Sequence, residues 1–444
     1  MKGTKNLEAA KKLADFSASP AAMALYEKNF AVVATPGFSK PDPLLPADYE
    51  KHLIKNDFAW ASANRDRILA EWTKRYDGKS EKNDIAVGAS IRNFGQMLVT
   101  GQPPGIMLDL ARESRALYLD WADKAGIFAR ANGALLFARN AAEEAVLDEF
   151  MATRAPAFGY NVKLLRSADL ANLYDGRFLR HRAALQGFDD LQLYSREAIP
   201  ALASWLATQG VRFHFGTLVR HVEGGRLETT AGVCNAQRVV VCSGHDYQTL
   251  CADQLRALQP QVCRLQMLRV TPEDGFRLEH AVLTGLSCTH YGAFADLPTA
   301  QALAMQIEHQ RPELARHGIH LLVSPTPYGD WIVGDSHDYG QDARPFNAES
   351  VDNILLDLAR DTFGAKLRVV ERWQGVYGAK CRVPGSGAFS ITRVDDRTTV
   401  ALMHSGIGMS VGPALAHRHM DALVDGTELP QWTPPASVPA DVAA

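Results

Sequence analysis

The sequence predicts an α/β fold that is preceded by a helical segment, and two observations carry this prediction. From about residue 84 onward, apolar runs of strand length alternate with amphipathic stretches of helical period. The basic residues change type at the same point, because 11 of the 15 lysines lie in residues 1–83 and 29 of the 32 arginines follow. Lys and Arg behave alike on a solvated surface, so this change indicates two segments of different origin. A Lys-rich helical surface, or chance, is the alternative.

Composition excludes several classes of protein. The 444 residues are 46% hydrophobic and carry a formal net charge of −3. This composition excludes a disordered chain, and it excludes a protein that binds nucleic acid through bulk positive charge. The sequence has no apolar window of about 18 residues that could span a membrane, and its N-terminus has no apolar signal core. We therefore expect a cytoplasmic chain. The six cysteines form no CxxC pair and have no histidine at zinc-finger spacing. We therefore expect reduced, mostly buried thiols and no metal site. The oligomeric state cannot be read from the sequence.

The first segment is predicted to be helical. Ser19 and Pro20 have the cap-then-proline form that begins a helix over about 21–29, and four prolines over 36–46 form an extended linker. A further helix is predicted over 58–76 from its apolar stripe. Nothing in this segment supplies a nucleophile, a base or a ligand cluster.

The second segment alternates helices and strands. In order, we predict a helix over 106–125, a strand over 133–137, a helix from Ser195, a strand over 211–215 and a strand over 239–242 that ends in Ser243 and Gly244. A buried strand that runs into small residues lets the backbone approach a phosphate or ribose closely.

The Gly-rich stretch near the C-terminus is the strongest local signal. A β run over 399–403 enters the turn HSGIGMSVG at 404–412, and a helix follows with Pro413 in its first turn and Gly426 at its end. The N–H groups and the dipole at such a helix start favour an electron-rich ligand edge. An ordinary strand-to-helix turn is the alternative.

Three further stretches raise the weight of this signal: GASIRNFG at 88–95, GDSHDYG at 334–340 and RWQGVYG at 372–378. Together they resemble the D-amino-acid oxidase and glycine oxidase type of FAD-dependent oxidoreductase, and most of all a subgroup associated with phosphonate breakdown. The resemblance covers about residues 84–432. It implies an incomplete Rossmann-like FAD-binding domain (84–125, 190–260 and 373–428), a substrate domain with a mixed or antiparallel sheet (126–189 and 261–372) and a disordered tail over 433–444.

The resemblance also implies the residues of the site. The cofactor FAD would be bound by Ala89, Ser90, Asn93, Gly95, Val219, Ser243, Gly244, Gly406, Gly408, Met409 and Ser410. The catalytic candidates are Tyr377, His404 and Arg382, with His290 and His337 as further candidates to anchor a substrate. For each of these, a purely structural role is the alternative. The implied reaction oxidises the C–N bond of a small amine, amino acid or aminophosphonate by hydride transfer to flavin.

The sequence departs from this family at its start. Cofactor binding in the family begins with a strand, a GxGxxG turn and a helix, and no GxGxxG occurs in the 444 residues. Residues 2–81 instead resemble the C-terminal end of an aminoethylphosphonate-type solute-binding protein of an ABC importer. Glu81 falls where the acid that holds the ribose would be, by descent or by coincidence. We therefore expect impaired FAD binding. The alternatives are an inactive gene-fusion product or a remnant of an importer's ligand-binding protein.

Overall fold

The computed structural model describes residues 86–341, 344–381 and 387–437, apart from the side chains of Lys380 and Cys381, together with residues 11–12, 15–17, 19–22 and 64. The chain forms two units, Met1–Gly78 and Lys79–Ala444. In the first unit Ser19 Oγ accepts a hydrogen bond from the Ala22 N–H at 3.3 Å, as expected of a helix cap. The helix predicted over 58–76 lies outside the described residues, Asn64 excepted.

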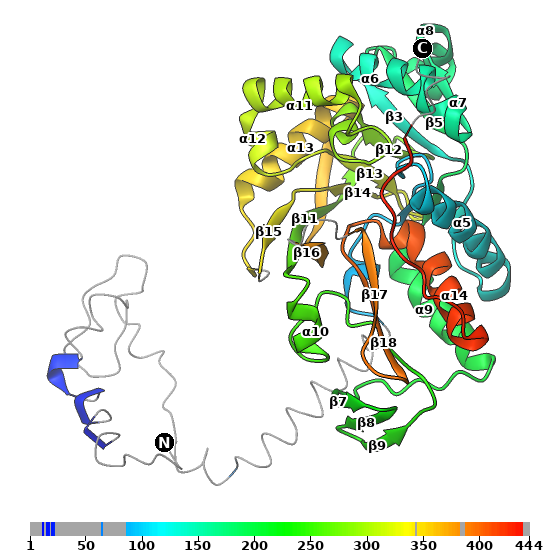
Figure 1. Cartoon of the computed structure of the whole chain (residues 1–444). Coiled ribbons are helices and arrows are strands. Elements are labelled where there is room, and N and C mark those ends of the chain that lie inside the picture. Colours follow the sequence, from blue (N-terminus) through cyan, green and yellow to red (C-terminus); the bar gives the residue numbers. More distant parts are fainter. Residues whose placement is uncertain are drawn as a thin grey trace. The chain divides into compact units, whose positions relative to one another are not determined.

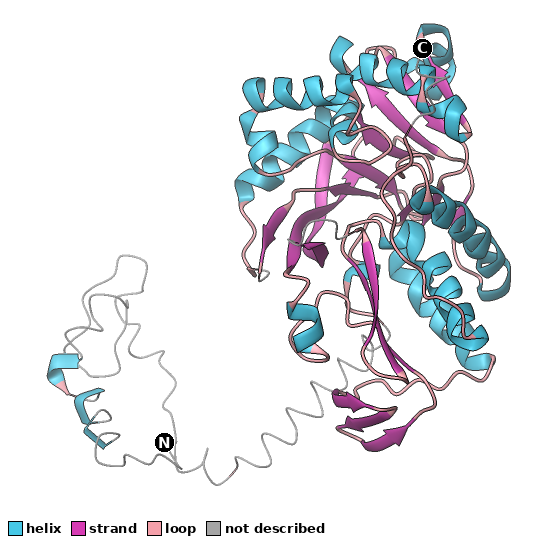
Figure 2. Ribbon diagram, viewed as in Figure 1, coloured by secondary structure: helices cyan, strands magenta, loops and turns pink. Residues whose placement is uncertain are grey.

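Among the described residues, the longer elements belong to the second unit (Figures 1 and 2). Its helices are η2 (Ala89–Ile91), α5 (Ile106–Ala125), α6 (Ala141–Ala152), α7 (Arg154–Phe158), α8 (Ser167–Asn172), η3 (Leu173–Gly176), α9 (Ser195–Thr208), α10 (Ala252–Arg256), η4 (Gly285–Thr289), α11 (Pro298–Gln310), α12 (Pro312–Arg316), α13 (Glu349–Phe363) and α14 (Gly408–Asp425). Its strands are β1 (Gln96–Met97), β2 (Ala129–Arg130), β3 (Ala134–Ala138), β4 (Val162–Leu165), β5 (Ala183–Gly187), β6 (Leu191–Leu193), β7 (Val219–Glu223), β8 (Arg226–Thr229), β9 (Gly232–Asn235), β10 (Val239–Val241), β11 (Pro260–Pro272), β12 (Ala281–Thr284), β13 (Leu322–Pro325), β14 (Trp331–Gly334), β15 (Asp338–Gly340), β16 (Leu367–Cys381), β17 (Phe389–Arg393) and β18 (Thr398–Met403).

A mixed nine-stranded sheet forms the larger part of this unit. Its order is β15-β11-β14-β13-β12-β3-β5-β4, and β16 pairs with β11 along the whole length of that strand. The β12–β3 pair is parallel and the other pairs are antiparallel. Helix α13 packs on β11 and β14, whereas α6 packs on β3. The sheet therefore has a hydrophobic cluster on each face, and a mixed sheet is what the sequence predicts for this part.

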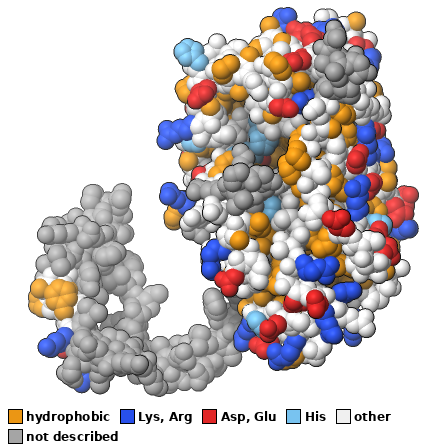
Figure 3. Space-filling model, viewed as in Figure 1, with side chains coloured by type: hydrophobic (Ala, Val, Ile, Leu, Met, Phe, Trp, Pro, Cys, Tyr) orange, Lys and Arg blue, Asp and Glu red, His pale blue; other side chains and the backbone are white. Residues whose placement is uncertain are grey.

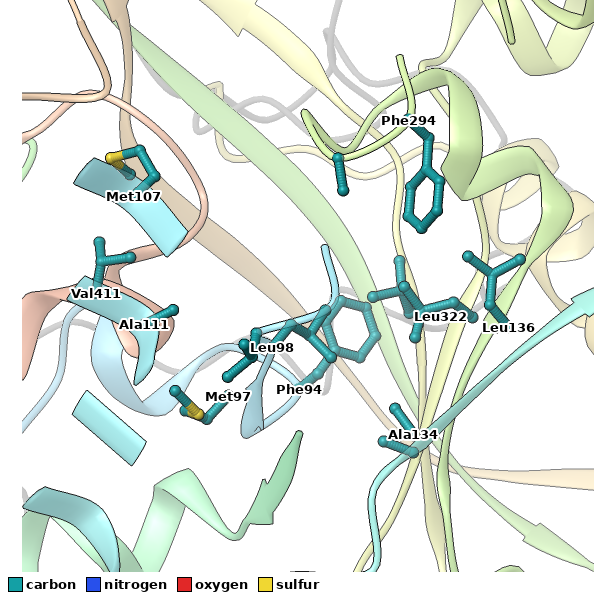
Figure 4. Close-up of a cluster of buried hydrophobic side chains, with 14 of the residues drawn as sticks. Phe94, Met97, Leu98, Met107, Ala111, Ala134, Leu136, Phe294, Leu322 and Val411 are labelled. Atoms are coloured by element: carbon teal, nitrogen blue, oxygen red, sulfur yellow. The ribbon is translucent and has the colours of Figure 1, made fainter. Parts of the chain in front are cut away.

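A smaller sheet has the order β10-β18-β17, with β10 parallel to β18. Helices α5 and α14 pack against each other beside it, where Ser114 Oγ accepts a hydrogen bond from the Ala414 N–H at 3.0 Å. Residues 94–98 lie between this helix pair and the large sheet. Figure 4 shows this packing for Phe94, Met97, Leu98, Met107, Ala111, Ala134, Leu136, Phe294, Leu322 and Val411. One of the hydrophobic clusters thus extends from the large sheet to α5 and α14, and the smaller sheet adds a cluster of its own.

Within the described part of the second unit, most of the predicted elements are confirmed, and one strand is wrong. Helices α5 and α9 and strands β3, β10 and β18 lie within a residue or so of their predicted bounds. The predicted strand over 211–215 is absent, and Val211, Phe213 and Phe215 are exposed. A strand forms by pairing, and no described strand pairs with this stretch. Strand β10 is likewise the last strand at its edge of the described sheet.

The cysteines are only partly as expected. Cys234, Cys242, Cys251, Cys263 and Cys288 are free thiols. Cys263 and Cys288 are buried, but Cys234 and Cys242 are exposed, so the expectation of mostly buried thiols is wrong for these two. The side chain of Cys381 lies outside the described residues.

The second unit has a surface of mixed charge and carries the C-terminal tail. On the visible face of the second unit, basic and acidic side chains are interspersed (Figure 3). Among the described helices, none combines the length and the apolar character that crossing a membrane requires. The disordered tail over 433–444 stays a prediction, and within it the Ala436 N–H donates a hydrogen bond to the Pro104 carbonyl at 3.2 Å.

Candidate functional site

The loop over 88–95 is shaped by its own asparagine. Asn93 Nδ2 donates to the carbonyls of Ala89 and Ser90 at 2.9 and 3.0 Å, and Asn93 Oδ1 accepts from the Gly95 N–H at 2.8 Å. These bonds close η2 into a compact turn. The Asn93 side chain therefore serves the loop itself, whereas a cofactor contact at this residue would come from its backbone.

The same loop is fixed to the rest of the unit at Arg92 and at Gly95. Trp373 Nε1, on β16, donates to the Arg92 carbonyl at 3.1 Å. The Leu193 N–H donates to the Gly95 carbonyl at 2.7 Å, where Gly95 has a φ of +73°. A Cβ at Gly95 would lie 2.1 Å from the Leu193 carbonyl oxygen. Only glycine allows this approach, which explains the residue at the end of GASIRNFG.

The start of α14 lies at the other side of the site. Ile407 at its N-cap offers no side-chain cap, so the first N–H groups of the helix remain available to a ligand. The side chain of Ser410 contacts the protein itself, because its Oγ accepts a hydrogen bond from the Leu98 N–H at 2.9 Å. This bond ties the chain that follows the 88–95 loop to the start of α14. Two of the predicted cofactor-binding segments are thereby held together.

The predicted place of Pro413 is wrong. The helix begins at Gly408, so Pro413 lies inside α14, beyond its first turn. Gly426 does end the helix, with the left-handed conformation expected of a helix stop. Near the helix start, Tyr118 Oη lies 3.8 Å from Met409 Sδ and donates to it.

Tyr377 lies beside the turn that precedes α14. It is on β16, opposite Cys263 of β11, and a Cβ at Gly406 would lie 3.2 Å from its Cζ. Burial raises the pKa of Tyr377 well above its ordinary value, so the phenol stays protonated and can donate a hydrogen bond. Gly406 itself is exposed. The structure thus brings the catalytic candidate Tyr377 to the predicted cofactor turn.

His404 is placed less favourably for catalysis. His404 is buried, and its backbone N–H donates to the Ala388 carbonyl. Its ring Nε2 lies 2.7 Å from Ser390 Oγ. Burial lowers the pKa of His404 to about 4, so the ring is neutral at ordinary pH. These contacts fit a side chain that supports the β17–β18 pair. Arg382, the third catalytic candidate, lies outside the described residues.

Ser243 and Gly244 follow β10 at the carboxyl end of the parallel pair. Ser243 Oγ is buried and has no hydrogen-bond partner within the described residues, and Gly244 has a φ of +64°. An unpaired buried hydroxyl next to a glycine turn is what a polar ligand group would satisfy. Val219, in contrast, begins β7 in the separate β7-β8-β9 sheet, away from α14 (Figure 1).

These residues fit the flavin end of FAD better than its diphosphate. The uncapped start of α14 and the exposed Gly406 are features that a ring with polar edges would meet. The diphosphate normally meets a strand, a glycine turn and a helix start. The described residues hold no such unit beside β10.

Three further buried ionisable groups near Tyr377 come from other segments. His337 has its ring 6.4 Å from the Tyr377 ring, centre to centre, and Asp335 and His320 lie behind it. The GDSHDYG stretch pointed to His337, but sequence reasoning missed His320. No motif surrounds His320, and only the fold brings it to the other two.

Comparison with known proteins agrees with this geometry. The family model described as "FAD dependent oxidoreductase" matches residues 80–421. Glycine oxidase from Geobacillus kaustophilus is a similar solved structure, with 20% identity, a TM-score of 0.59 and coverage of 80% of this chain and 89% of that chain. No curated protein sequence matches the chain.

Two further solved structures share the fold. Iminodiacetate oxidase from Chelativorans sp. BNC1 has 13% identity and a TM-score of 0.56, with 78% of this chain and 88% of that chain covered. L-α-glycerophosphate oxidase from Mycoplasma pneumoniae, solved with FAD bound, has 16% identity and a TM-score of 0.58, with 78% and 87% covered.

Proposed function

The chain belongs to the FAD-dependent oxidoreductase family, and we propose that it oxidises the carbon–nitrogen bond of a small amine, amino acid or aminophosphonate. The observation that carries this proposal is the meeting of three segments. The Ser410 bond to Leu98 joins the chain just after the 88–95 loop to α14, and Tyr377 lies against the turn before α14. The similar solved structures named glycine oxidase and iminodiacetate oxidase support an amine as the substrate class.

FAD, when bound, supplies the acceptor for a hydride from the carbon next to the amine. The chain's own residues orient the substrate for this step. Tyr377 keeps its proton because it is buried, and its hydroxyl can donate to an acidic group of the substrate. Gly406 has no side chain and leaves that edge of the site open. No described residue is required as a dedicated base if the amine binds in its neutral form.

The phosphonate assignment is the finer part of this proposal. The GASIRNFG, GDSHDYG and RWQGVYG stretches support it, as does the resemblance of residues 2–81 to an importer component for aminophosphonates. Genes for the uptake and the breakdown of one compound often lie side by side. A deletion that joined two such genes accounts for both halves of the chain and for the boundary near residue 83. The division into an FAD-binding part and a substrate part is proposed on the same resemblance.

We further propose that FAD binding is impaired. The sequence has no GxGxxG, β10 is the edge of its described sheet, and the apolar 211–215 stretch has no described strand beside it. The loss of a strand, a glycine turn and a helix from the FAD-binding part would leave all three of these features. A catalytically inactive fusion product is the alternative. An importer remnant is the weaker one, because the 80–421 match covers most of the chain.

The test is anaerobic mixing of the flavin-loaded protein with glycine, N-methylglycine or 2-aminoethylphosphonate, followed by the visible absorption of oxidised flavin. We expect at least one amine to bleach this absorption. Tyr377→Phe should lower the bleaching rate constant about 10–100-fold, since a hydrogen bond to a charged group contributes about 1.5–3 kcal/mol.

Tyr328→Phe is the matched control, because Tyr328 is 68% exposed and its hydroxyl donates to Glu197. Its bleaching rate should equal that of the unmodified protein. If flavin-loaded protein is bleached by none of the amines, the proposed reaction is wrong. If the two variants are equally fast, Tyr377 does not orient the substrate.

A further inference from the structure

Three histidines from distant parts of the chain meet beside the candidate site. His290 follows η4, His320 precedes β13, and His337 precedes β15. One ring nitrogen from each lies within 4.8 Å of the others. Asp335 completes the group, with its two carboxylate oxygens 3.5 Å from His320 Nε2 and 3.8 Å from His337 Nε2. We call these four residues the histidine cluster.

Hydrogen bonds fix which ring nitrogen faces the centre of the cluster. His337 Nδ1 lies 2.9 Å from the Gly318 carbonyl oxygen, which can only accept, so the neutral ring has its proton on Nδ1 and its lone pair on Nε2. Ser287 Oγ donates to the His320 carbonyl at 2.8 Å and lies 3.3 Å from His320 Nδ1. That oxygen can accept from Nδ1, which leaves a second lone pair on His320 Nε2. Outer hydrogen bonds of this kind orient histidines that bind metals.

The centre of the cluster is short of partners. The side chains of His320 and Asp335 are 5% and 8% exposed. Neither His320 Nε2 nor Asp335 Oδ1 has a hydrogen-bond partner within the described residues, although the two atoms face each other. A buried polar atom without a partner is costly, and a buried carboxylate is more so. A ligand placed between these atoms would satisfy both.

The charges indicate that this ligand is a cation. In the described part of the chain, the ion-pair partners of Asp335 are His320 and His337, and neither Lys nor Arg contacts it. A bound anion would meet the carboxylate and two nitrogen lone pairs, so an anionic substrate group is disfavoured here. Imidazole nitrogens with one carboxylate oxygen form a donor set that suits a divalent first-row transition metal.

We propose that His290, His320, His337 and Asp335 bind a divalent transition-metal ion, with Zn²⁺ as the probe of choice. Metal–ligand bonds of about 2.0–2.2 Å require the four donor atoms to draw together by about an ångström. His290 is exposed, and its ring stacks on the His320 ring with 4.0 Å between the ring centres, so its donor atom already lies near those of the other two histidines. The proposed metal site adjoins Tyr377 through the His337 ring, whose centre is 6.4 Å from that of the Tyr377 ring. The existence of the site does not depend on the proposed oxidase reaction.

Sequence spacing gives only part of this site, because Asp335 and His337 are two residues apart but His290 and His320 are remote from them. Metal motifs are recognised when two ligands lie a few residues apart on one element, whereas here the three histidines come from three separate connections. The expectation of no metal site considered only the cysteines and zinc-finger spacing. The structure supplies the long-range contacts that such a search leaves out.

The test uses the untagged full-length protein, freed of metal and titrated with Zn²⁺ in competition with a coloured chelator. We expect one high-affinity Zn²⁺ per chain, and an affinity at least about tenfold lower for His290→Ala and for Asp335→Asn. His309→Ala is the matched control, because His309 is an exposed histidine on α11 outside the cluster. Its affinity should be unchanged.

A second readout covers the possibility of misfolding. Zn²⁺ should raise the thermal unfolding temperature of the unmodified protein and of His309→Ala, but not that of His290→Ala. The metal-free unfolding temperature of His290→Ala is the reference for this shift, because His290 stacks on the His320 ring and its loss alone can lower that temperature. A protein that retains no Zn²⁺, or equal titrations of His290→Ala and His309→Ala, would overturn the proposal.

Discussion

Gly95→Ala destabilises the fold by about 2–5 kcal/mol, whereas Gly88→Ala in the same loop changes stability by less than about 1 kcal/mol. Gly95 has a φ of +73°, and an added Cβ would lie 2.1 Å from the backbone oxygen of Leu193. A backbone atom cannot move aside as a flexible side chain can. Gly88 has a φ of −91° and no atom within 4 Å of the same added Cβ.

Urea unfolding of the two variants measures this difference. The flavin content after loading should fall in parallel, because Gly95 positions the loop that carries Ala89 and Ser90. Equal stability of the two variants would show that the 88–95 loop does not dock on Leu193 as described.

Asp190→Ala is the second large effect, with an expected loss of about 2–5 kcal/mol. Asp190 is 1% exposed, and its Oδ1 accepts from the N–H groups of Val99 and Thr100 at 2.6 and 2.9 Å. Removing the carboxyl leaves both buried donors unpaired, at about 1–3 kcal/mol each. The neighbouring Asp189 is a matched control, since its carboxylate bonds to an exposed Asn161 and its loss should cost less than about 1 kcal/mol.

The effect of Asp190 on stability also depends on pH. Burial raises the pKa of Asp190 from 3.8 to about 6, so the folded protein holds this proton more tightly than the unfolded chain does. The stability that Asp190 contributes is therefore complete below about pH 4 and is lost as the pH rises through 6. Asp190→Asn keeps an acceptor oxygen and carries no charge. Its stability relative to the unmodified protein should rise between pH 4 and about 7, as urea unfolding at several pH values would show. If the difference in unfolding free energy between Asp190→Asn and the unmodified protein stayed constant over this range, the Asp190 carboxyl would be ionised throughout.

The sequence predicted the elements whose signals are local. Helix α5 was predicted over its observed span, since a helix makes its own hydrogen bonds and Gly126 ends it. The stretch over 211–215 has an equally strong strand pattern but forms no strand, because pairing depends on a partner elsewhere in the chain. Propensity alone cannot report whether that partner is present.

The candidate site shows the same limit. The turn at 404–412 and the 88–95 loop were predicted from their glycines, and the structure explains Gly95 and Gly406 by close approaches to Leu193 and Tyr377. Ser410 and Asn93 were predicted to bind the cofactor, yet their side chains bond within the protein. Which polar side chain is left for a ligand depends on long-range contacts such as that of Leu98, and these cannot be read from a motif.

The most direct test of the central claim is a titration of the purified chain with FAD and, separately, with riboflavin, followed by quenching of flavin fluorescence. The account predicts that both ligands bind and that FAD is preferred by no more than about tenfold, because contacts to the diphosphate worth several multiples of 1.4 kcal/mol are missing. Binding of neither ligand would contradict the proposal that the 88–95 loop and the start of α14 bind a flavin ring. A preference for FAD far above tenfold would show that the chain still holds the diphosphate.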